Sequence, residues 1–197
     1  MKLVIATGNA GKLEEFRQLL GDPGLELMSL ADFPEIDDIE ENGATFEENA
    51  LIKARTVTGL TGLVALADDS GLMVNALGGL PGVKSARFAP TTAERNRKLL
   101  DMLENVPDGD RTARFVCSLA LVRPDGFEWT TTGTCVGIIV REPAGDGGFG
   151  YDPLFFYEPF GATFAEIPRE QKNTISHRGK ALAAFKEAIE ISRILEF

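Results

Sequence analysis

Short apolar runs and stretches of helical period alternate along the first part of the chain. Residues 3–6 form an apolar run of the kind that a buried strand shows. Apolar side chains then recur at three- and four-residue spacings over 13–20, which predicts a helix, and the glycine and proline breakers in 21–24 should end it. Residues 25–30 predict a second strand. The chain thus opens as strand, glycine loop, helix and strand.

A second helix and a third strand follow. Thr45 and Glu48 form the pair of a capping box, in which each side chain bonds a backbone N–H at a helix start, and this helix should run to Gly59. Residues 63–67 are wholly apolar and predict a buried strand. We expect that strand to end where it meets the polar residues 68–71.

The rest of the chain mixes helices with antiparallel strands. A further capping box, Thr91 with Glu94, begins a helix that should end near Pro107. Residues 112–122 and 127–140 predict the clearest hairpin, around a Pro-Asp-Gly turn. A glycine-dense loop follows this hairpin, and an amphipathic helix begins near the C-terminus. This order predicts an α/β protein with a mixed sheet.

The composition is that of an ordinary folded protein with an excess of acidic groups. The 197 residues are 44% hydrophobic and 25% charged, and 20 basic against 30 acidic side chains give a net charge of −10. We expect one domain over 1–197. General nucleic-acid and anionic-membrane binding need a basic face, so no nucleic acid and no membrane is expected as a partner, whereas a phosphate ligand with a metal ion stays possible. No stretch approaches the ~20 apolar residues of a membrane span, and the apolar start is too short for a signal peptide.

The two cysteines, Cys117 and Cys135, both lie in apolar, β-branched runs. We expect buried free thiols in a reducing compartment rather than a disulfide, because a core of this size needs no covalent staple. Cytoplasmic residence follows from that expectation. With one histidine and no CxxC pair, the chain lacks the material for a thiolate–imidazole zinc site or thioredoxin-like chemistry.

The opening glycine loop, residues 7–12, compares with a P-loop but does not meet its pattern. A P-loop needs a glycine five residues before its Gly-Lys pair and a Ser or Thr directly after it, and here Ala6 and Leu13 occupy those positions. An ATPase P-loop is therefore excluded. A glycine loop before a helix still offers backbone N–H groups and a partial positive charge to an anion, and Lys12 adds a full charge. A tight turn with an exposed lysine is the alternative.

Two adjacent carboxylates, Asp68 and Asp69, follow the apolar run 63–67. Their burial is costly unless they are solvated, paired or bound to a metal, and such oxygen ligands suit Mg²⁺. Adjacent residues of an extended strand point to opposite faces, so we expect only one of the two to face a site. A plain turn is the alternative. The acidic stretch 35–41 offers a second metal ligand, or else a solvated face.

Two further segments carry groups that suit a nucleotide base. Residues 149–153, Phe-Gly-Tyr-Asp-Pro, can sandwich a planar base and bond its edge, although glycine loops of this kind are also plain hairpin ends. His177 and Arg178 lie at the start of the last predicted helix, with Lys172 before them. We favour a ligand-binding role over a general-base role for His177, because no Cys or Ser partner is identifiable.

Six motifs occur in the order in which one enzyme family has them. They are Thr7-Gly8-Asn9-Ala10-Gly11-Lys12, Glu40-Glu41-Asn42-Gly43, Ala67-Asp68-Asp69-Ser70-Gly71-Leu72, Leu77-Gly78-Gly79-Leu80-Pro81-Gly82, Gly148-Phe149-Gly150-Tyr151-Asp152-Pro153 and Ser176-His177-Arg178-Gly179. They span nearly the whole chain. On these motifs the chain resembles the inosine triphosphate pyrophosphatase family, also called XTP/dITP diphosphatases.

The resemblance implies an elongated central mixed sheet with flanking helices and two lobes around a nucleotide-binding cleft, in a homodimer. It also implies an activity: Mg²⁺-dependent hydrolysis of deaminated purine nucleoside triphosphates (ITP, dITP and XTP) to the monophosphate and pyrophosphate. Such an activity would cleanse the nucleotide pool.

Roles for single residues are implied in the same way. Asp69 would be the general base and a metal ligand, and Glu40 the second metal ligand, with Glu41 as the fallback. Ser70 would touch the substrate. The other substrate-binding residues would be Thr7, Gly8, Asn9, Ala10, Gly11 and Lys12 at the triphosphate, Lys53, Lys172 and Arg178 as positive charges, and Phe149, Gly150, Tyr151, Asp152 and His177 at the base.

Three other functions stay open. The chain could hydrolyse other nucleotides, for example modified pyrimidine triphosphates, or it could be a nucleotide-binding regulatory module, or a structural dimerisation protein. Asp69 with an acidic partner favours an enzyme over a sensor, since a sensor needs no group that activates water. A dimerisation protein would leave the glycine loops and the Asp68-Asp69 pair unexplained.

Overall fold

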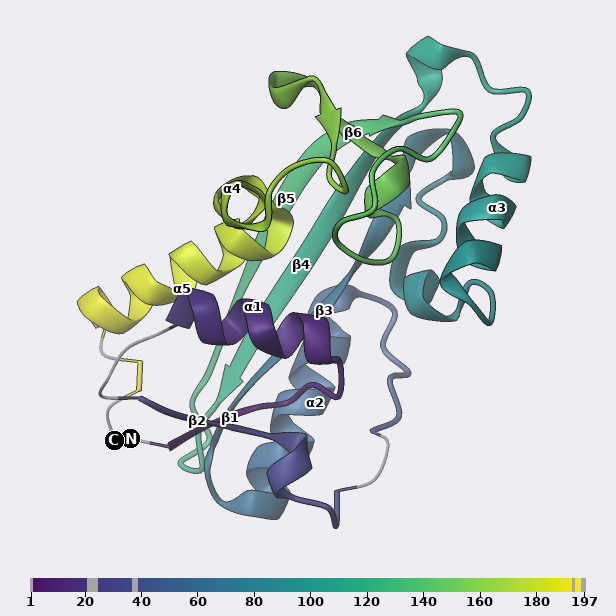
Figure 1. Cartoon of the computed structure of the whole chain (residues 1–197). Helices are drawn as coiled ribbons and strands as arrows, with labels where there is room; N and C mark the ends of the chain where they lie inside the picture. The colour runs from purple at the N-terminus through teal and green to yellow at the C-terminus, as the bar shows by residue number, and fades with distance from the viewer. Residues whose placement is uncertain (1, 21–24, 37–38, 193, 196–197) are drawn as a thin grey trace. The chain divides into compact units, whose positions relative to one another are not determined.

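The structure is a computed structural model that describes residues 2–20, 25–36, 39–192 and 194–195 (Figure 1). Its strands are β1 (Lys2–Ile5), β2 (Glu26–Ser29), β3 (Val64–Val74), β4 (Thr112–Val122), β5 (Glu128–Ile139), β6 (Phe155–Tyr157) and β7 (Ala162–Thr163). Its α-helices are α1 (Ala10–Leu20), α2 (Phe46–Thr61), α3 (Thr92–Met102), α4 (Arg169–Ile175) and α5 (His177–Ser192). Short 3₁₀ turns join several of these elements.

The described strands form one mixed sheet of seven strands in the order β2-β1-β3-β4-β5-β6-β7. Strand β1 runs parallel to both neighbours, with Leu3 opposite Leu27 of β2 and Val64 of β3. Strand β6 runs antiparallel to both of its neighbours, β5 and β7. The α/β class and the mixed sheet are therefore confirmed. The elongation of the sheet and the cleft between two lobes stay predictions.

Two compact units make up the chain. Unit 1 contains residues 1–69, 117–133 and 178–197, and unit 2 contains residues 70–116 and 134–177. Strands β3, β4 and β5 each contribute residues to both units. The single domain expected over 1–197 stays a prediction.

Unit 1 is built as a sheet covered by helices on both faces. Alternate residues of β1, β3 and β4 point to opposite faces, as the pleat requires. On one face, Leu3, Leu66 and Leu119 pack against α1 and α5, which contribute Phe16 and Phe185. On the other face, smaller strand side chains pack against α2; these are Val4, Ala65, Ala67 and Ala120. The small residues let α2 approach the strands closely, near the two carboxylates of β3.

Unit 2 has a core of its own that is rich in aromatic side chains. Leu99 of α3 and Leu103, directly after this helix, pack with the ends of β3, β4 and β5. The rings of Phe115, Phe155 and Phe164 stand in mutual contact, with centroids 4.6 to 5.8 Å apart. Edge and offset contacts of this kind fix ring positions beyond what burial alone does. The loop of residues 148–153 is attached to this core.

Local capping explains where the helices begin. The Thr45–Glu48 capping box is present at the start of α2, as is the Thr91–Glu94 box at the start of α3. Helix α2 continues past the expected Gly59 and is closed by Gly62 in the left-handed conformation, with φ +67°. Helix α3 stops at Met102, before the expected end near residue 107.

Strand β3 is longer than the sequence predicts, and this is the most important difference in the fold. It does not end before residues 68–71 but continues through them to Val74, so Asp68 and Asp69 both lie inside a strand and are buried. A plain turn at this position is therefore wrong. Buried carboxylates are tolerated where cations pair with them, and both have such partners.

Three short elements have no counterpart in the sequence prediction. They are β6, β7 and α4, of three, two and seven residues. By contrast, the 112–122 and 127–140 hairpin and the last helix agree closely with β4, β5 and α5. The predicted end of the first helix at 21–24 and the acidic residues 37–38 lie outside the described residues.

No disulfide joins the two cysteines, and both are buried, Cys117 in β4 and Cys135 in β5. Free buried thiols are thus confirmed. Burial, reinforced by the nearby Asp68, raises the pKa of the Cys117 thiol to about 12. No helix of the described residues is long and apolar enough to cross a membrane.

Both cysteines should resist thiol reagents until the protein unfolds. The reactive species is the thiolate, and at pH 8 only about one Cys117 side chain in 10⁴ would be ionised even without its steric protection. With 5,5′-dithiobis(2-nitrobenzoate) at pH 8, we expect no release of thionitrobenzoate from native protein and release from both thiols in guanidinium chloride. Rapid labelling of native protein would contradict this burial.

Candidate functional site

The loop between β1 and α1 is an ordered helix start with an exposed surface. The backbone N–H of Lys12 donates to Asn9 Oδ1 at 3.1 Å, and the N–H of Asn9 donates to Thr7 Oγ1 at 3.2 Å. Gly8 and Asn9 are exposed, and residues 10–12 form the first turn of α1. A helix N-terminus presented in this way can receive an anion through free backbone N–H groups and the helix dipole. The loop therefore has the features that the sequence predicted for a phosphate site.

Asp68 is the centre of a buried ion network in unit 1. It is 1% exposed, and its Oδ2 lies 2.9 Å from Lys12 Nζ and 3.1 Å from Arg178 Nη2. Arg178 in turn bonds Glu15 through Nη1. Burial alone would raise the pKa of Asp68, but the charges of Lys12 and Arg178 bring it well below its ordinary value. Asp68 therefore stays ionised and joins the glycine loop to the start of α5.

Asp69 has different partners from its neighbour. Its Oδ2 accepts a hydrogen bond from Asn49 Nδ2 at 3.0 Å, and its Oδ1 lies 3.8 Å from Lys53 Nζ. Asn49 and Lys53 are four residues apart on α2, so both project from one face of that helix. Burial raises the pKa of Asp69 above its ordinary value, even though Lys53 and Asn49 act in the opposite sense. A carboxylate with a raised pKa is a better proton acceptor.

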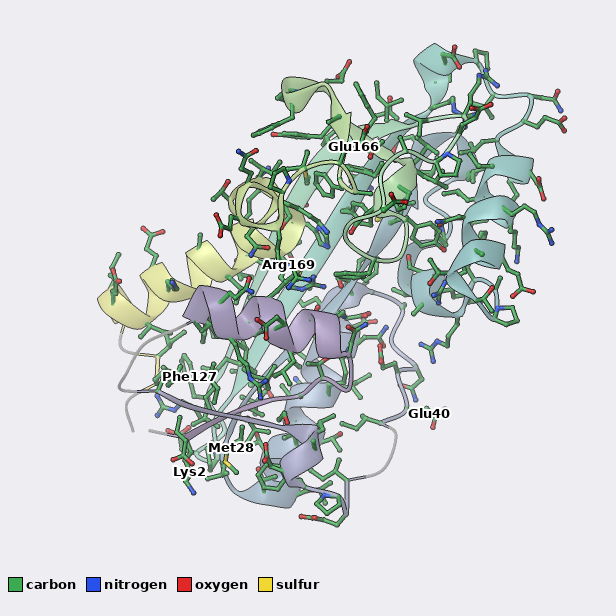
Figure 2. The ribbon with its side chains drawn as sticks, in the orientation of Figure 1. Lys2, Met28, Glu40, Phe127, Glu166 and Arg169 are labelled. Atoms are coloured by element: carbon green, nitrogen blue, oxygen red, sulfur yellow. The ribbon has the colours of Figure 1, made fainter. Side chains whose placement is uncertain are left out.

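The motif that precedes α2 places one of its two glutamates near Asp69. Glu41 Oε2 lies 3.4 Å from Lys53 Nζ, the ammonium that also faces Asp69. Glu40 is exposed and points outward from the same segment (Figure 2). Gly43 donates its N–H to Asn49 Oδ1 at 2.8 Å, and a Cβ at this glycine would stand 2.7 Å from that oxygen. The glycine of the motif thus allows Asn49 to connect this segment to Asp69.

The carboxylates around Lys53 are a suitable donor set for Mg²⁺. Within the described ranges no three His, Cys, Asp or Glu side chains gather as a complete metal cluster. Magnesium commonly takes only one or two carboxylates and completes its shell with water and substrate phosphates. Asp69 and Glu41, which share the ammonium of Lys53, meet that requirement.

In unit 2, the predicted base-binding residues of the 148–153 loop come together around one ion pair. Asp152 Oδ2 lies 2.6 Å from Lys172 Nζ of α4 and accepts the backbone N–H of Phe149 at 2.7 Å. The ammonium of Lys172 also stands 5.0 Å from the centroid of the Phe149 ring, which is 40% exposed. Gly148 has φ +69°, and a Cβ there would stand 2.1 Å from Asp152 Oδ2. The loop therefore presents an exposed ring beside a fixed cation.

The other predicted contacts in unit 2 are His177, Tyr151 and Ser70. His177 is 6% exposed and stacks on Phe115, with ring centroids 4.8 Å apart. Tyr151 is buried, and its hydroxyl donates to the carbonyl of Ser85 at 3.0 Å. Ser70 is half-buried in β3. Packing accounts for the positions of Tyr151 and His177, so any effect of their bulk on a ligand is exerted from inside the core.

Sequence reasoning missed two residues that hold the carboxylates in place. Asn49 is fully buried on α2 and bonds Asp69, while Glu15 is buried on α1 and bonds Arg178. A signal existed for Asn49: it is a polar residue one position before Ala50 and four before Lys53, on the apolar side of a helix. A buried amide at such a position needs a hydrogen-bond partner.

Comparison with known proteins gives one consistent result. The model of the Ham1 family matches residues 3–188. A dITP/XTP pyrophosphatase of Geobacter sulfurreducens is 53% identical over 94% of this chain and 95% of its own length. The dITP/XTP pyrophosphatase of Escherichia coli K12 is 48% identical over 95% of this chain and 98% of its own.

Solved structures agree with the sequence comparisons. A HAM1 protein from Coxiella burnetii superimposes with a TM-score of 0.90 at 44% identity and covers 96% of this chain and 98% of its own. The Ham1 protein of Staphylococcus aureus gives a TM-score of 0.88 at 37% identity, with the same coverage. The resemblance drawn from the six motifs is thereby confirmed, and the chain belongs to the Ham1 family.

Proposed function

We propose that the chain hydrolyses dITP and XTP, together with ITP, to the nucleoside monophosphate and pyrophosphate. The observation that carries this proposal is Asp69, a buried carboxylate of raised pKa held between an amide and an ammonium group beside a second carboxylate. Relatives that share about half of its residues are named dITP/XTP pyrophosphatases, which supports the substrate class.

The triphosphate would bind to the loop of residues 7–12. Exposed backbone N–H groups at the start of α1 and the ammonium of Lys12 suit phosphate oxygens. Lys53 would add a second cation. These localised positive charges are needed because the whole chain carries a net charge of −10.

Asp69 would orient a water molecule for attack on the α-phosphorus and take up its proton. Its raised pKa suits that role, and the bond from Asn49 fixes the carboxylate while leaving its second oxygen toward Lys53. The leaving group is pyrophosphate, whose developing charge Lys12 and the loop N–H groups would stabilise.

Asp69 and a glutamate of residues 40–41 would hold Mg²⁺. The family motif favours Glu40, but the contacts give more support to Glu41, because it shares Lys53 with Asp69. The ion would supply charge neutralisation for the phosphates and a Lewis acid at the scissile group. The protein's own part is to fix the carboxylates, through Lys53 and Asn49.

The base would be recognised by the 148–153 loop with Lys172, and the buried His177 would act on it through its bulk, from inside the core. Phe149 offers an exposed ring for stacking, and Lys172 is a donor held in place by Asp152. Hypoxanthine and xanthine carry a 6-oxo group where adenine carries an amino group, so a donor aimed at that position is left unpaired by adenine. Arg178 is buried with Asp68 and Glu15, and it would act by supporting the site.

A panel of nucleoside triphosphates with Mg²⁺ tests the proposal. We expect pyrophosphate as the primary product and a kcat/KM for ITP at least ~100-fold above that for ATP, since an unpaired buried donor costs this much. Chelation with EDTA should abolish turnover. Orthophosphate as the first product would exclude attack at the α-phosphorus, and a preference for modified pyrimidine triphosphates would redirect the substrate class. Sedimentation equilibrium on the same sample checks the homodimer that belongs to this proposal.

A further inference from the structure

The proposed function leaves one of the six motifs without a role, the segment Leu77–Gly82. In the structure this segment folds back on the end of β3. Val74 N–H donates to Leu80 O at 3.0 Å, Gly79 N–H donates to Val74 O at 3.0 Å, and Met73 forms an isolated bridge with Pro81. Because of these contacts, the 3₁₀ turn that follows, Gly82–Arg87, lies beside β3.

Ser85 of that turn bonds its own turn and two other segments, strand β3 and the 148–153 loop. Its Oγ accepts the N–H of Leu72 at 2.9 Å and donates to Gly82 O at 2.6 Å. Its carbonyl accepts the hydroxyl of Tyr151 at 3.0 Å. The side chains of Ser85, Leu72 and Tyr151 are all buried, so water does not replace these bonds.

Through its hydrogen bond to Ser85, Tyr151 holds the 148–153 loop in place. Burial raises the pKa of Tyr151 to about 12, so its hydroxyl stays protonated and donates to Ser85. Its two neighbours in the loop are Gly150, whose φ is +64°, and Asp152, which holds Lys172. A glycine in the left-handed region adds no side-chain restraint of its own, so the Tyr151 ring and the Asp152 carboxylate set the course of the loop.

We propose that Ser85 is a positioning residue for base recognition, which acts by holding the end of β3 with its side chain and Tyr151 with its carbonyl. This inference rests on the proposed function, in which the 148–153 loop receives the base. Leu72, Ser85 and Tyr151 all belong to unit 2. Ser85 therefore ties the loop that would read the base to the part of β3 that lies in unit 2.

Steady-state kinetics with dITP and dATP test this role. Ser85→Ala removes the side-chain bonds, and Tyr151→Phe removes only the bond from the loop to the Ser85 carbonyl. Each variant should lower the ratio of kcat/KM for dITP to that for dATP by about tenfold, chiefly through KM for dITP, because displacement of a binding group by ~1 Å is enough for losses of this size. Because the two changes act on one connection, the double variant should lose no more than the larger single loss.

Ser118→Ala is the matched control. Ser118 is also buried and bonds Thr132 at 2.9 Å, so its replacement lowers stability without touching this connection, and the dITP/dATP ratio should stay at the wild-type value. A ratio within about twofold of wild type in folded Ser85→Ala or in Tyr151→Phe overturns the inference, as do multiplicative losses in the double variant. A wild-type enzyme that shows no preference for dITP instead defeats the proposed function before any variant is compared.

Discussion

Replacing Asp69 by asparagine should lower kcat for dITP about 10³-fold, the largest effect expected from any single conservative change in the chain. The amide cannot take a proton from water, and it is a poor magnesium ligand. Its oxygen can still accept the hydrogen bond from Asn49, and Glu41 still offers Lys53 a partner. The loss should therefore fall on turnover and not on folding.

The melting temperature is the first control for this variant. Burial raises the pKa of Asp69, which means that the folded protein disfavours its charge, so a neutral amide should leave the melting temperature unchanged or slightly higher. Affinity for dITP, measured directly on the slow variant at saturating Mg²⁺, should fall much less than kcat. Near-wild-type turnover would remove Asp69 from the role of general base.

Replacing Asp68 by asparagine should give the opposite result, with a large loss of stability and a smaller loss of turnover. The change removes the carboxylate that pairs with both the buried Arg178 and Lys12, while Glu15 still bonds Arg178. Breaking a buried ion network by removing one partner typically costs about 3–5 kcal/mol. For a chain of this size, that corresponds to a fall in melting temperature on the order of 10 °C.

Glu128→Gln provides the comparison for this second result. Glu128 makes a paired contact with Arg55, with both distances 2.7 Å, but the pair is on the surface. Surface ion pairs contribute little, so the melting temperature should barely move. If Asp68→Asn melts like wild type, or if it is the variant without turnover while Asp69→Asn is active, the roles given to the two carboxylates are wrong.

Local signals in the sequence were enough to predict most helices and strands. The capping boxes at Thr45 and Thr91 mark the starts of α2 and α3, because capping depends only on residues three apart. The β4–β5 hairpin was equally clear, since its turn and its strands are contiguous. Strands β6 and β7 were missed because they are too short to show any period.

The extent of β3 could not be predicted because its support comes from distant parts of the chain. An Asp-Asp pair in an apolar strand is unfavourable on local evidence, and we therefore expected the strand to end before these two residues. The compensating cations are Lys12, Lys53 and Arg178, on three different helices. The sequence of the strand gives no sign of these partners, so its continuation through Asp68 and Asp69 could not be predicted from it.

The sequence predicts which kinds of residue form the site better than it predicts which individual residue takes each role. The opposite-face argument separated Asp68 from Asp69, and their different partners agree with it. The choice between Glu40 and Glu41 depends on side-chain direction in a segment without regular structure, where no period decides which residue points inward. The roles of Asn49 and Glu15 could not be predicted, because each depends on a partner that is remote in sequence, Asp69 and Arg178 respectively.

The path of the chain between its two units has a consequence for how such a protein is made. The backbone passes from one unit to the other after residues 69, 116, 133 and 177, so unit 1 is assembled from three stretches of sequence and unit 2 from two. Unit 1 includes residues 178–192 of α5, which pack on its sheet and follow every residue of unit 2 in the sequence. Unit 1 therefore cannot finish folding before every residue of unit 2 has been synthesised. No contiguous gene fragment encodes either unit alone, and recombination can exchange them only together.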